Sequence, residues 1–369
     1  MDDKWYSIAN IAEIPSPSIL VYPDRIEENL QRMIRLAGGA QRLRPHVKTH
    51  KMPQVIALKI KCGISKFKVS TIAEAEMTAA AGGQDILLAY QPVGPNGSRL
   101  ARLITTFPAA QFSTIVDNLA TAEELSRIAR DRDITFRLYV DLDVGFHRTG
   151  IAPDDRAFEL YQAITRTKGL QAMGLHAYDG HLHHPEHGEL ERAVVSAFDP
   201  VWKLRDKIIA AGLHAPKIVA SGTPTFPILS RHEDVEVGCG TTVLWDFGQA
   251  KVCPDLQFVN AALLITRVIS RPASDRLCFD LGHKAVASEM QPPRVSLIGL
   301  EDAEPVVHSE EHLVMRTDRA TEYSPGQVFY AIPRHICPTI ALHQEAWVVH
   351  NGIATETWPI VARARRITI

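Results

Sequence analysis

A unit that repeats along the first two thirds of the sequence most constrains the fold. Each unit is a short apolar or β-branched run, a turn, and a stretch with helical periodicity. The units recur about every 25 to 30 residues, which is typical of strand–helix pairs that build one parallel sheet. The expected strands are 18–22, 43–48, 66–71, 85–90, 111–117, 135–143, 170–178 and 217–221, with a ninth candidate at 235–240. The expected helices include 23–36, 53–62, 73–81, 120–130, 154–167 and 189–211.

The number of units favours a closed barrel over an open doubly wound sheet, which would share the same alternation. A doubly wound sheet would normally carry a G-x-G-x-x-G motif after its first strand, whereas residues 18–22 lead into Pro23-Asp24-Arg25. From about residue 256 the pattern changes to strand-like runs without long helices. These runs are 261–269, 276–280, 311–316, 327–331, 345–350 and 352–361.

We therefore predict an α/β protein with a (β/α)8 TIM-like barrel over residues 18–255. A smaller C-terminal β domain is expected over residues 256–369. Residues 1–17 are too few for a domain, and we expect them to join the β domain as an added strand.

Composition narrows the class of partner. The chain has 40 Lys and Arg against 42 Asp and Glu, so it offers no broad basic field for nucleic acid or anionic lipid. No window approaches the roughly 18 apolar residues of a membrane span, and the first residues are acidic and polar, unlike a secretory signal. The five cysteines have no C-x-x-C spacing and are expected to be free thiols. These features predict a cytoplasmic protein that binds a small molecule.

Residues that could act in catalysis or binding lie at the C-terminal ends of the expected barrel strands. Lys48 ends the second run, where a lysine facing the barrel interior would lose hydration unless a partner or a Schiff base compensated. The alternative is a solvated lysine just beyond the strand. The turns Ser221-Gly222-Thr223 and Gly238-Cys239-Gly240-Thr241 offer backbone N–H groups and hydroxyls suited to a phosphate, although glycine turns are also common for steric reasons alone.

Histidines cluster after the seventh run, at positions 181, 183, 184 and 187. Such a cluster is typical of a base or metal ligand near neutral pH, and the alternative is a solvated loop without chemistry. In the β domain, His335-Ile336-Cys337 would place two metal-binding side chains on the same side of an extended chain. Two ligands do not make a site, so a third would come from elsewhere, from substrate or from water.

Several motifs occur together and in order over nearly the whole chain. They are R-P-H-V-K-T-H-K, H-R-T-G, A-Y-D-G-H with His183 and His184, S-G-T-P-T, G-C-G-T, D-L-G-H-K and P-R-H-I-C-P-T. This set resembles the D-threonine aldolase and D-serine dehydratase family, a branch of the pyridoxal-phosphate enzymes with an alanine-racemase-like fold. The resemblance implies a barrel followed by a β domain, and a homodimer whose active site is completed by the two domains of a partner chain.

The resemblance also implies site residues. Lys48 would form the Schiff base with pyridoxal 5'-phosphate, while His335 and Cys337 would bind a divalent metal such as manganese, magnesium or zinc. His184 is the expected base, with His181 second. The residues expected to hold the cofactor are Lys48, Arg148, Tyr178, Ser221, Gly222, Thr223, Gly240 and Thr241.

The expected reaction is retro-aldol cleavage of a D-3-hydroxy amino acid, with D-threonine giving glycine and acetaldehyde. The histidine-rich loop favours this aldolase reaction, whereas the thiol in His-x-Cys favours a dehydratase acting on D-serine or D-3-hydroxyaspartate. A 3-hydroxyaspartate aldolase stays open as a subclass. A non-catalytic pyridoxal-phosphate carrier and a racemase are weaker alternatives, because neither has a use for a metal pair.

Overall fold

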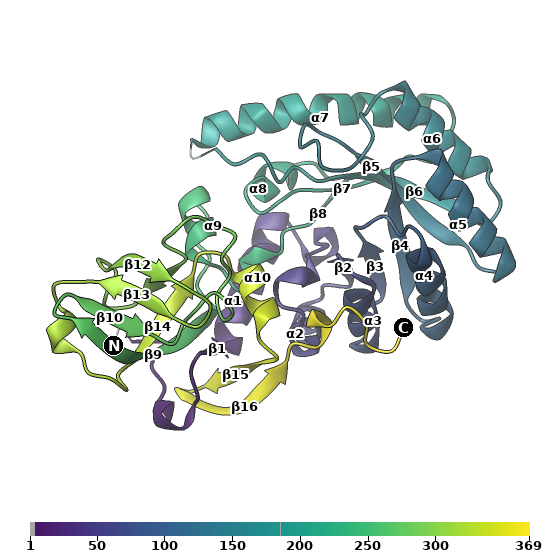
Figure 1. Ribbon diagram of the computed structural model, residues 1–369. Helices are drawn as coiled ribbons and strands as arrows, with labels where there is room; N and C mark the ends of the chain where they lie inside the picture. The colour runs from purple at the N-terminus through teal and green to yellow at the C-terminus, as the bar shows by residue number, and fades with distance from the viewer. Residues whose placement is uncertain (1–3, 185) are drawn as a thin grey trace. The chain divides into compact units, whose positions relative to one another are not determined.

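The computed structural model describes residues 4–184 and 186–369, and within these ranges no helix is long and apolar enough to cross a membrane. The chain divides into two compact units, and we call them the sheet unit and the barrel unit (Figure 1). The sheet unit comprises Met1–Leu30, Thr49–Met52 and Thr241–Arg363. The barrel unit comprises Gln31–Lys48, Pro53–Gly240 and Ala364–Ile369.

A parallel sheet of seven strands forms the centre of the barrel unit within the described residues. Its order is β2 (Lys66–Val69), β3 (Asp85–Leu88), β4 (Gln111–Val116), β5 (Phe136–Leu142), β6 (Leu170–Ala177), β7 (Lys217–Ala220) and β8 (Val235–Val237). Residues 43–46 connect the two edge strands, because Leu43 bridges Val237 of β8 and His46 bridges Lys68 of β2. The predicted alternation and the parallel barrel sheet are therefore confirmed.

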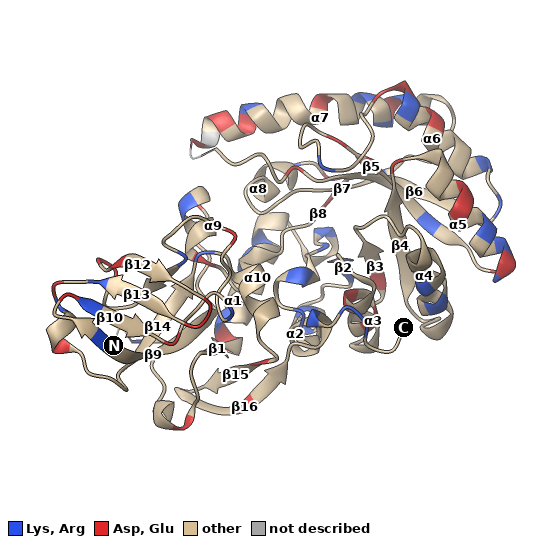
Figure 2. Cartoon of the chain, in the orientation of Figure 1, with Lys and Arg blue, Asp and Glu red and all other residues tan. Residues whose placement is uncertain are grey.

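Helices follow the strands and lie along the outer side of the sheet (Figure 1). They are α2 (Pro53–Lys61), α3 (Ile72–Ala80), α4 (Pro95–Thr106), α5 (Leu119–Asp131), α6 (Asp155–Arg166), α7 (His187–Ala210) and the short α8 (Phe226–Leu229). Side chains of Thr71, Asn118 and Asp154 cap the first turns of α3, α5 and α6 by accepting backbone N–H hydrogen bonds. Figure 2 shows charges of both signs distributed along α5, α6 and α7, as expected for solvated helix faces.

One expected barrel strand belongs elsewhere. The run at 18–22 forms β1 (Ser18–Val21), which pairs with β9 (Ala262–Ala273) and β15 (Glu345–His350) in the sheet unit. Residues 43–46 occupy the position between β8 and β2 and form backbone hydrogen bonds with both strands. The ninth candidate strand, 235–240, forms β8. Because Ile19, Leu20 and Val21 are all fully buried, the run suits the centre of either sheet, and periodicity could not distinguish the two.

The interior of the barrel contains an apolar layer and a charged one. Leu87, Ile115, Tyr139 and Val219 pack together from four strands. Arg44, which is 1% exposed, donates to Glu236 at 2.7 Å and to both carboxylate oxygens of Asp85 at 2.8 and 3.0 Å. Burial would raise the pKa of Asp85, but the Arg44 hydrogen bond and charge hold that pKa below its usual value.

The sheet unit is built around a mostly antiparallel sheet, so the predicted β domain is confirmed. Its main path runs β12 (Glu304–His308), β13 (Leu313–Arg316), β10 (Arg276–Phe279), β9, β1, β15 and β16 (Ile353–Pro359), with β14 (Val328–Pro333) and β11 (Val295–Leu297) on a side branch from β9. The strands β11 and β12 lay outside the expected runs. Two short helices, α9 (Phe247–Val252) and α10 (Ile336–Leu342), complete the unit, and α1 (Pro23–Ala37) follows β1.

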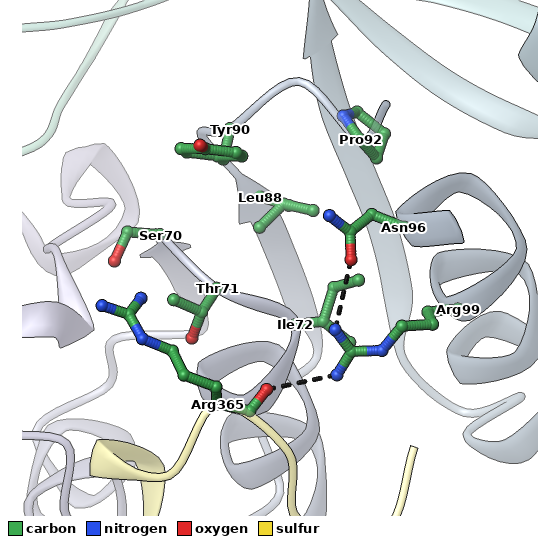
Figure 3. Close-up of a pocket in the computed structure, with 9 residues that line it drawn as sticks. All are labelled: Ser70, Thr71, Ile72, Leu88, Tyr90, Pro92, Asn96, Arg99 and Arg365. Carbon is green, nitrogen blue, oxygen red and sulfur yellow. Dashed lines mark hydrogen bonds between the residues drawn. The ribbon is translucent and has the colours of Figure 1, made fainter. Parts of the chain in front are cut away.

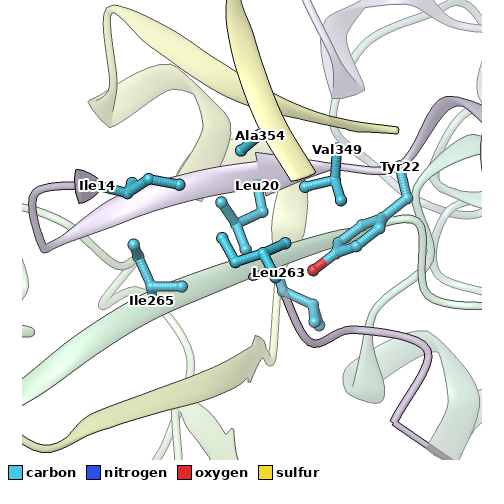
Figure 4. Close-up of a cluster of buried hydrophobic side chains, with 8 residues drawn as sticks. Ile14, Leu20, Tyr22, Leu263, Ile265, Val349 and Ala354 are labelled. Atoms are coloured by element: carbon cyan, nitrogen blue, oxygen red, sulfur yellow. The ribbon is translucent and has the colours of Figure 1, made fainter. Parts of the chain in front are cut away.

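Apolar side chains far apart in the sequence form the core of the sheet unit (Figure 4). Leu20 of β1 and Leu263 of β9 are fully buried, and Val349 of β15 packs in the same cluster. Ile14 and Ile8 join this cluster from the segment before β1, which fixes that segment against the sheet. Its described residues, 4–17, form turns and a 3-10 helix (Ile11–Glu13), so the expected added strand is wrong there. Burying apolar side chains of this size contributes about 1.5 to 3 kcal/mol each.

Candidate functional site

Three cationic side chains of the barrel unit lie around the ring of Tyr178. The Lys48 Nζ is 5.8 Å from the ring centroid, the Lys68 Nζ is 5.6 Å from it, and the Arg148 Cζ is 4.8 Å from it. Arg148 and Tyr178 follow β5 and β6, and each of the three residues was predicted from the sequence. Lys48 lies in a 3-10 helix (Val47–Thr49) directly after residues 43–46, so the expected strand at 43–48 is wrong at this residue. The fold therefore brings these three predicted residues to one place at the strand ends.

The loop after β5 owes its shape to Asp143 and to two glycines. The Asp143 carboxylate accepts backbone N–H bonds from Gly145 at 3.0 Å and His147 at 2.9 Å, and it contacts the His147 ring at 2.7 Å. Gly145 and Gly150 have positive φ, and a Cβ at Gly150 would stand 2.6 Å from the backbone of Asp143. This folded loop presents Arg148, whose Cζ is also 5.0 Å from the Phe146 ring centroid.

Lys68 is a site residue that the sequence analysis missed. Its side chain is almost completely buried on β2, and burial, together with the charge of Lys48, lowers the pKa of Lys68 to about 8. The argument that singled out Lys48, a lysine facing a barrel interior, applies better to Lys68. The signal was the alternation in K-F-K-V, which places Lys66 and Lys68 on one side of a strand.

Two glycines make room around this group of side chains. A Cβ added to Gly238 would stand 2.2 Å from the Lys68 Nζ, and one added to Gly180 would stand 2.5 Å from the Tyr178 hydroxyl. Both distances are shorter than any real Cβ contact, so a larger residue at either position would displace the side chain concerned. Gly180 of A-Y-D-G-H and Gly238 of G-C-G-T therefore allow close approach of these side chains.

Buried polar atoms without partners lie close to these residues in the sequence. His176 Nδ1 contacts Asp141 at 2.6 Å, whereas its Nε2 atom has no hydrogen-bond partner among the described residues. Asp179 Oδ2 likewise has no partner there, and burial raises the pKa of Asp179. Because buried polar groups are nearly always hydrogen-bonded, two such atoms beside Tyr178 fit a site that a polar ligand completes.

The expected phosphate turns are connected to each other and to Asp179. Ser221 has a positive φ of 79°, rare for a residue with a side chain, and its Oγ accepts from the Gly238 N–H at 3.1 Å. The Gly222 N–H donates to Asp179 Oδ1 at 2.6 Å and to Thr225 Oγ1 at 3.2 Å. Gly222 is therefore already engaged, while Thr223 and Gly240 are buried in the same unit. The expected phosphate contacts at Ser221, Gly222, Thr223 and Gly240 stay predictions.

The loop after β6 carries the predicted bases. His181 stacks on Phe146 with ring centroids 5.6 Å apart and planes 16° apart, and its Nδ1 has no partner among the described residues. Burial lowers the pKa of His181, so its imidazole is neutral and able to accept a proton at pH 7. His184 is half-buried and His183 is exposed. The side chain of His187, at the start of α7, lies outside the described residues.

The predicted metal pair lies in the sheet unit at the start of α10. His335 has extended backbone angles just before the helix, and Cys337 lies in its first turn, so the expected extended chain at Cys337 is wrong. The helix starts there because Asp246 accepts the Ile336 N–H at 2.9 Å and Pro338 is tolerated in a first turn. The proline was the available signal in the sequence.

The surroundings of His335 and Cys337 combine a thiol with acidic groups. His335 Nδ1 contacts Glu289 Oε1 at 2.6 Å, and Cys337 Sγ lies 3.2 Å from Thr49 Oγ1 and 3.5 Å from Thr241 Oγ1. Burial lowers the pKa of His335, but hydrogen bonding to Cys337 and contact with Glu289 raise that pKa to about 9. Within the described residues, no three His, Cys, Asp or Glu side chains are arranged to hold a metal. Imidazole and thiolate fit two positions of a zinc-type site, with Glu289 as an outer partner that orients the imidazole.

A protein-family model described as the alanine racemase N-terminal domain matches residues 21–242, more than half of the chain. The chain belongs to this family. A second family model, described as a serine dehydratase domain, matches residues 261–349. The alanine-racemase-like fold expected from the sequence motifs is thereby confirmed.

Curated relatives cover the chain almost from end to end. A D-threonine aldolase from an Arthrobacter species is 29% identical and aligns with 96% of this chain and 94% of its own. A 3-hydroxy-D-aspartate aldolase from Paracoccus denitrificans is 27% identical, over 96% and 93%. A D-threo-3-hydroxyaspartate dehydratase from a Delftia species is 31% identical, over 63% and 62%. These names bear out the expectation of an enzyme of the lyase class.

A solved structure agrees with the sequence relatives. The D-threonine aldolase from Filomicrobium marinum superposes with a TM-score of 0.88 at 25% identity, covering 96% of both chains. Within this alanine-racemase-like family, pyridoxal phosphate is the implied cofactor. An amine at a strand end, neighbouring cationic side chains and buried polar atoms without partners are what such a cofactor requires, so the residues present fit it.

Proposed function

We propose that the protein is a pyridoxal-phosphate- and metal-dependent lyase that cleaves D-threonine to glycine and acetaldehyde. The observation that carries the proposal is the convergence of Lys48, Lys68 and Arg148 on the Tyr178 ring. A lysine at a strand end can bond covalently to the cofactor aldehyde, while the other cations balance its phosphate and the substrate carboxylate. The names of the relatives support a D-3-hydroxy amino acid as substrate.

Named residues would bind the cofactor, orient it and transfer the proton. Lys48 would hold the cofactor, and when bound the cofactor withdraws electrons from the α-carbon of the amino acid. Tyr178 and Arg148 would orient it, and the turns at Ser221 and Gly240 would hold its phosphate. His184 would take the proton from the substrate β-hydroxyl, with His181 as the second candidate.

His335 and Cys337 would hold the divalent metal, which lowers the pKa of an alcohol bound to it. The Glu289 carboxylate at His335 Nδ1 would fix the imidazole so that Nε2 faces the metal. Thr49 and Thr241, in hydrogen-bonding range of Cys337 Sγ, would stabilise the thiolate form.

A dehydratase acting on D-serine or D-3-hydroxyaspartate is the second candidate. The observation that favours it is Cys337, because a thiolate selects zinc over harder ions and the Delftia relative is named as a dehydratase. A 3-hydroxyaspartate aldolase is the third outcome that the relatives support.

A product assay distinguishes these activities. The protein, loaded with pyridoxal phosphate and assayed separately with Mn²⁺ and Zn²⁺, is incubated with D-threonine, D-serine or D-3-hydroxyaspartate. We expect glycine and acetaldehyde in equal amounts from D-threonine. Pyruvate and ammonia from D-serine, or oxaloacetate and ammonia from D-3-hydroxyaspartate, would instead identify a dehydratase. Glyoxylate plus glycine from D-3-hydroxyaspartate alone would identify the other aldolase. No turnover with any of the three would contradict the proposal.

A further inference from the structure

A small cavity of about 220 Å³ lies in the barrel unit beside the ends of β2 and β3 and the start of α4 (Figure 3). Its lining residues are different from those assigned above to the cofactor, the bases and the metal. The volume lies below the roughly 300 Å³ at which pockets for drug-sized ligands begin, so any ligand is small.

The charged side chains that line this cavity are all positive. Arg99 and Arg365 contribute guanidinium groups, and no Asp or Glu is among the described residues of the lining. The half-buried Arg99 is fixed by three hydrogen bonds: it donates to Asn96 Oδ1 at 3.1 Å, to the Arg365 carbonyl at 3.2 Å and to the main-chain oxygen of Ile369 at 2.8 Å. These bonds orient the guanidinium.

A docked segment positions the second guanidinium. Residues 364–369 return to the barrel unit, where Glu76 accepts the N–H groups of Thr368 at 3.0 Å and Ile369 at 3.2 Å. Ile369 is 3% exposed, so the segment is anchored by burial as well as by hydrogen bonds. Figure 3 shows the Arg365 side chain extending from this segment toward Ser70 and Thr71.

Neutral hydrogen-bond donors complete the lining. Thr71 Oγ1 accepts the Glu74 N–H at 3.1 Å, which leaves its own hydroxyl proton to donate. Asn96 accepts from Arg99 through its oxygen, so its NH₂ group has hydrogens to donate. The carboxylate of Glu74 contacts Ser70 behind this lining, but it is buried and already accepts the Ser70 N–H at 2.6 Å and the Ser70 hydroxyl at 3.0 Å.

We propose that this cavity binds a small carboxylate or phosphate anion, with Arg99 and Arg365 as its cationic partners. Planar guanidinium groups pair with either anion through two parallel hydrogen bonds, and Thr71 and Asn96 supply further donors. The exposed Tyr90 ring stands beside the cavity and can cover an organic acid. Since both charged side chains of the lining are guanidinium groups, an anion is the ligand class that the lining favours.

Calorimetric titration of the full chain with inorganic phosphate and with succinate, at fixed ionic strength, tests this proposal. The chain is first saturated with pyridoxal phosphate, so that its cofactor phosphate turns are filled. We expect saturable binding of at least one anion. Binding of phosphate alone or of succinate alone supports the site and identifies the source of the anion, while no binding of either overturns the proposal.

Matched variants locate the binding. Arg365→Ala, an exposed position, should weaken binding at least tenfold, whereas the neighbouring exposed Arg366→Ala should leave it unchanged. On α4, Arg99→Gln should weaken binding, and the exposed Arg102→Gln one turn away should not. Equal losses in Arg365→Ala and Arg366→Ala would show a general charge effect, and wild-type affinity in Arg365→Ala would exclude the cavity. Either result overturns the proposal.

Discussion

Gly238 lies against the buried end of Lys68, so that a Cβ at position 238 would stand 2.2 Å from the Lys68 Nζ. Because the lysine is buried, Gly238→Ala should displace it at a cost of about 1 to 3 kcal/mol in the free energy of unfolding. It should also weaken pyridoxal-phosphate binding, measured by absorbance titration. Gly188→Ala, whose Cβ would meet only Arg192 Nη1 at 3.6 Å, should lower neither quantity. Wild-type stability and affinity in Gly238→Ala would contradict the close packing.

Lys68 predicts an unusual pH dependence of stability. Its pKa is lowered to about 8 in the folded protein, so the unfolded chain binds more protons between about pH 8 and 10.5. The cost of burying the charge is thus fully present below pH 8, and stability should rise as pH increases through that window. Lys68→Met should raise the free energy of unfolding at pH 7 by about 3 kcal/mol and flatten the rise, as followed by denaturant unfolding across pH 7 to 10.5.

A second buried lysine supplies the control for that prediction. Burial lowers the pKa of Lys59 on α2 to about 7. Lys59→Met should therefore also stabilise the protein, but only Lys68→Met should weaken cofactor binding. A stability unchanged or lowered in Lys68→Met at pH 7 would show that the lysine is held by favourable contacts that outweigh its desolvation.

Lys48→Ala should abolish the borohydride-reducible link between the chain and pyridoxal phosphate. Mass spectrometry of the reduced protein should find the label on Lys48 in the wild type. The matched control is Lys284→Ala, because Lys284 is exposed and pairs with Glu310 at 2.6 Å and Glu311 at 3.4 Å. A label that persists in Lys48→Ala and maps to Lys68 would move the covalent role to that residue.

His184→Gln should slow acetaldehyde release from D-threonine by about 10² to 10⁴, the usual contribution of a general base. Folding, cofactor content and metal content should be unchanged, since His184 is a half-buried loop residue. His183→Gln, an exposed neighbour, is the control. If His181→Gln shows the loss instead, the neutral imidazole stacked on Phe146 is the base.

Cys337→Ser should lower the content of bound divalent metal, measured by elemental analysis after dialysis, and reduce cleavage of D-threonine. The loss follows because a hydroxyl is a far weaker zinc ligand than a thiolate. Cys253→Ser in the same unit should retain the metal, since burial raises the pKa of Cys253 to about 12 and keeps it a thiol. Full metal content in Cys337→Ser would remove this residue from the metal site.

The sequence predicted the barrel strands where strand and helix alternate, because hydrophobic periodicity is a local property. It misplaced residues 18–22, because pairing with β9 and β15 depends on partners far away along the chain. It also missed β12. Val306 and Val307 of this strand are exposed, so the segment lacks the alternation of buried apolar and exposed polar residues by which a strand is predicted.

The candidate site also contains both residues that the sequence predicts and residues that it does not. Lys48, Arg148 and Tyr178 could be predicted because each follows a strand segment and stands in a recognisable motif. The buried Lys68 could not be separated from Lys66, because both lie on the same side of β2 and only the structure shows that Lys66 pairs with Glu236. The anion cavity depends on Arg365, which reaches Ser70 only because residues 364–369 return to the barrel unit.

The position of β1 between β9 and β15 has a consequence for synthesis. Ile19 pairs with Ala346 on one edge and with Leu264 on the other, so neither edge can be completed until the ribosome has made most of the chain. At about 5 to 20 residues per second, β1 waits roughly 15 to 60 s for its last partner. The strands from β2 to β8 meet no such delay, so the barrel unit can assemble while an apolar segment upstream of it is still uncovered. Ile19, Leu20 and Val21 are therefore where a chaperone would be needed on the nascent chain.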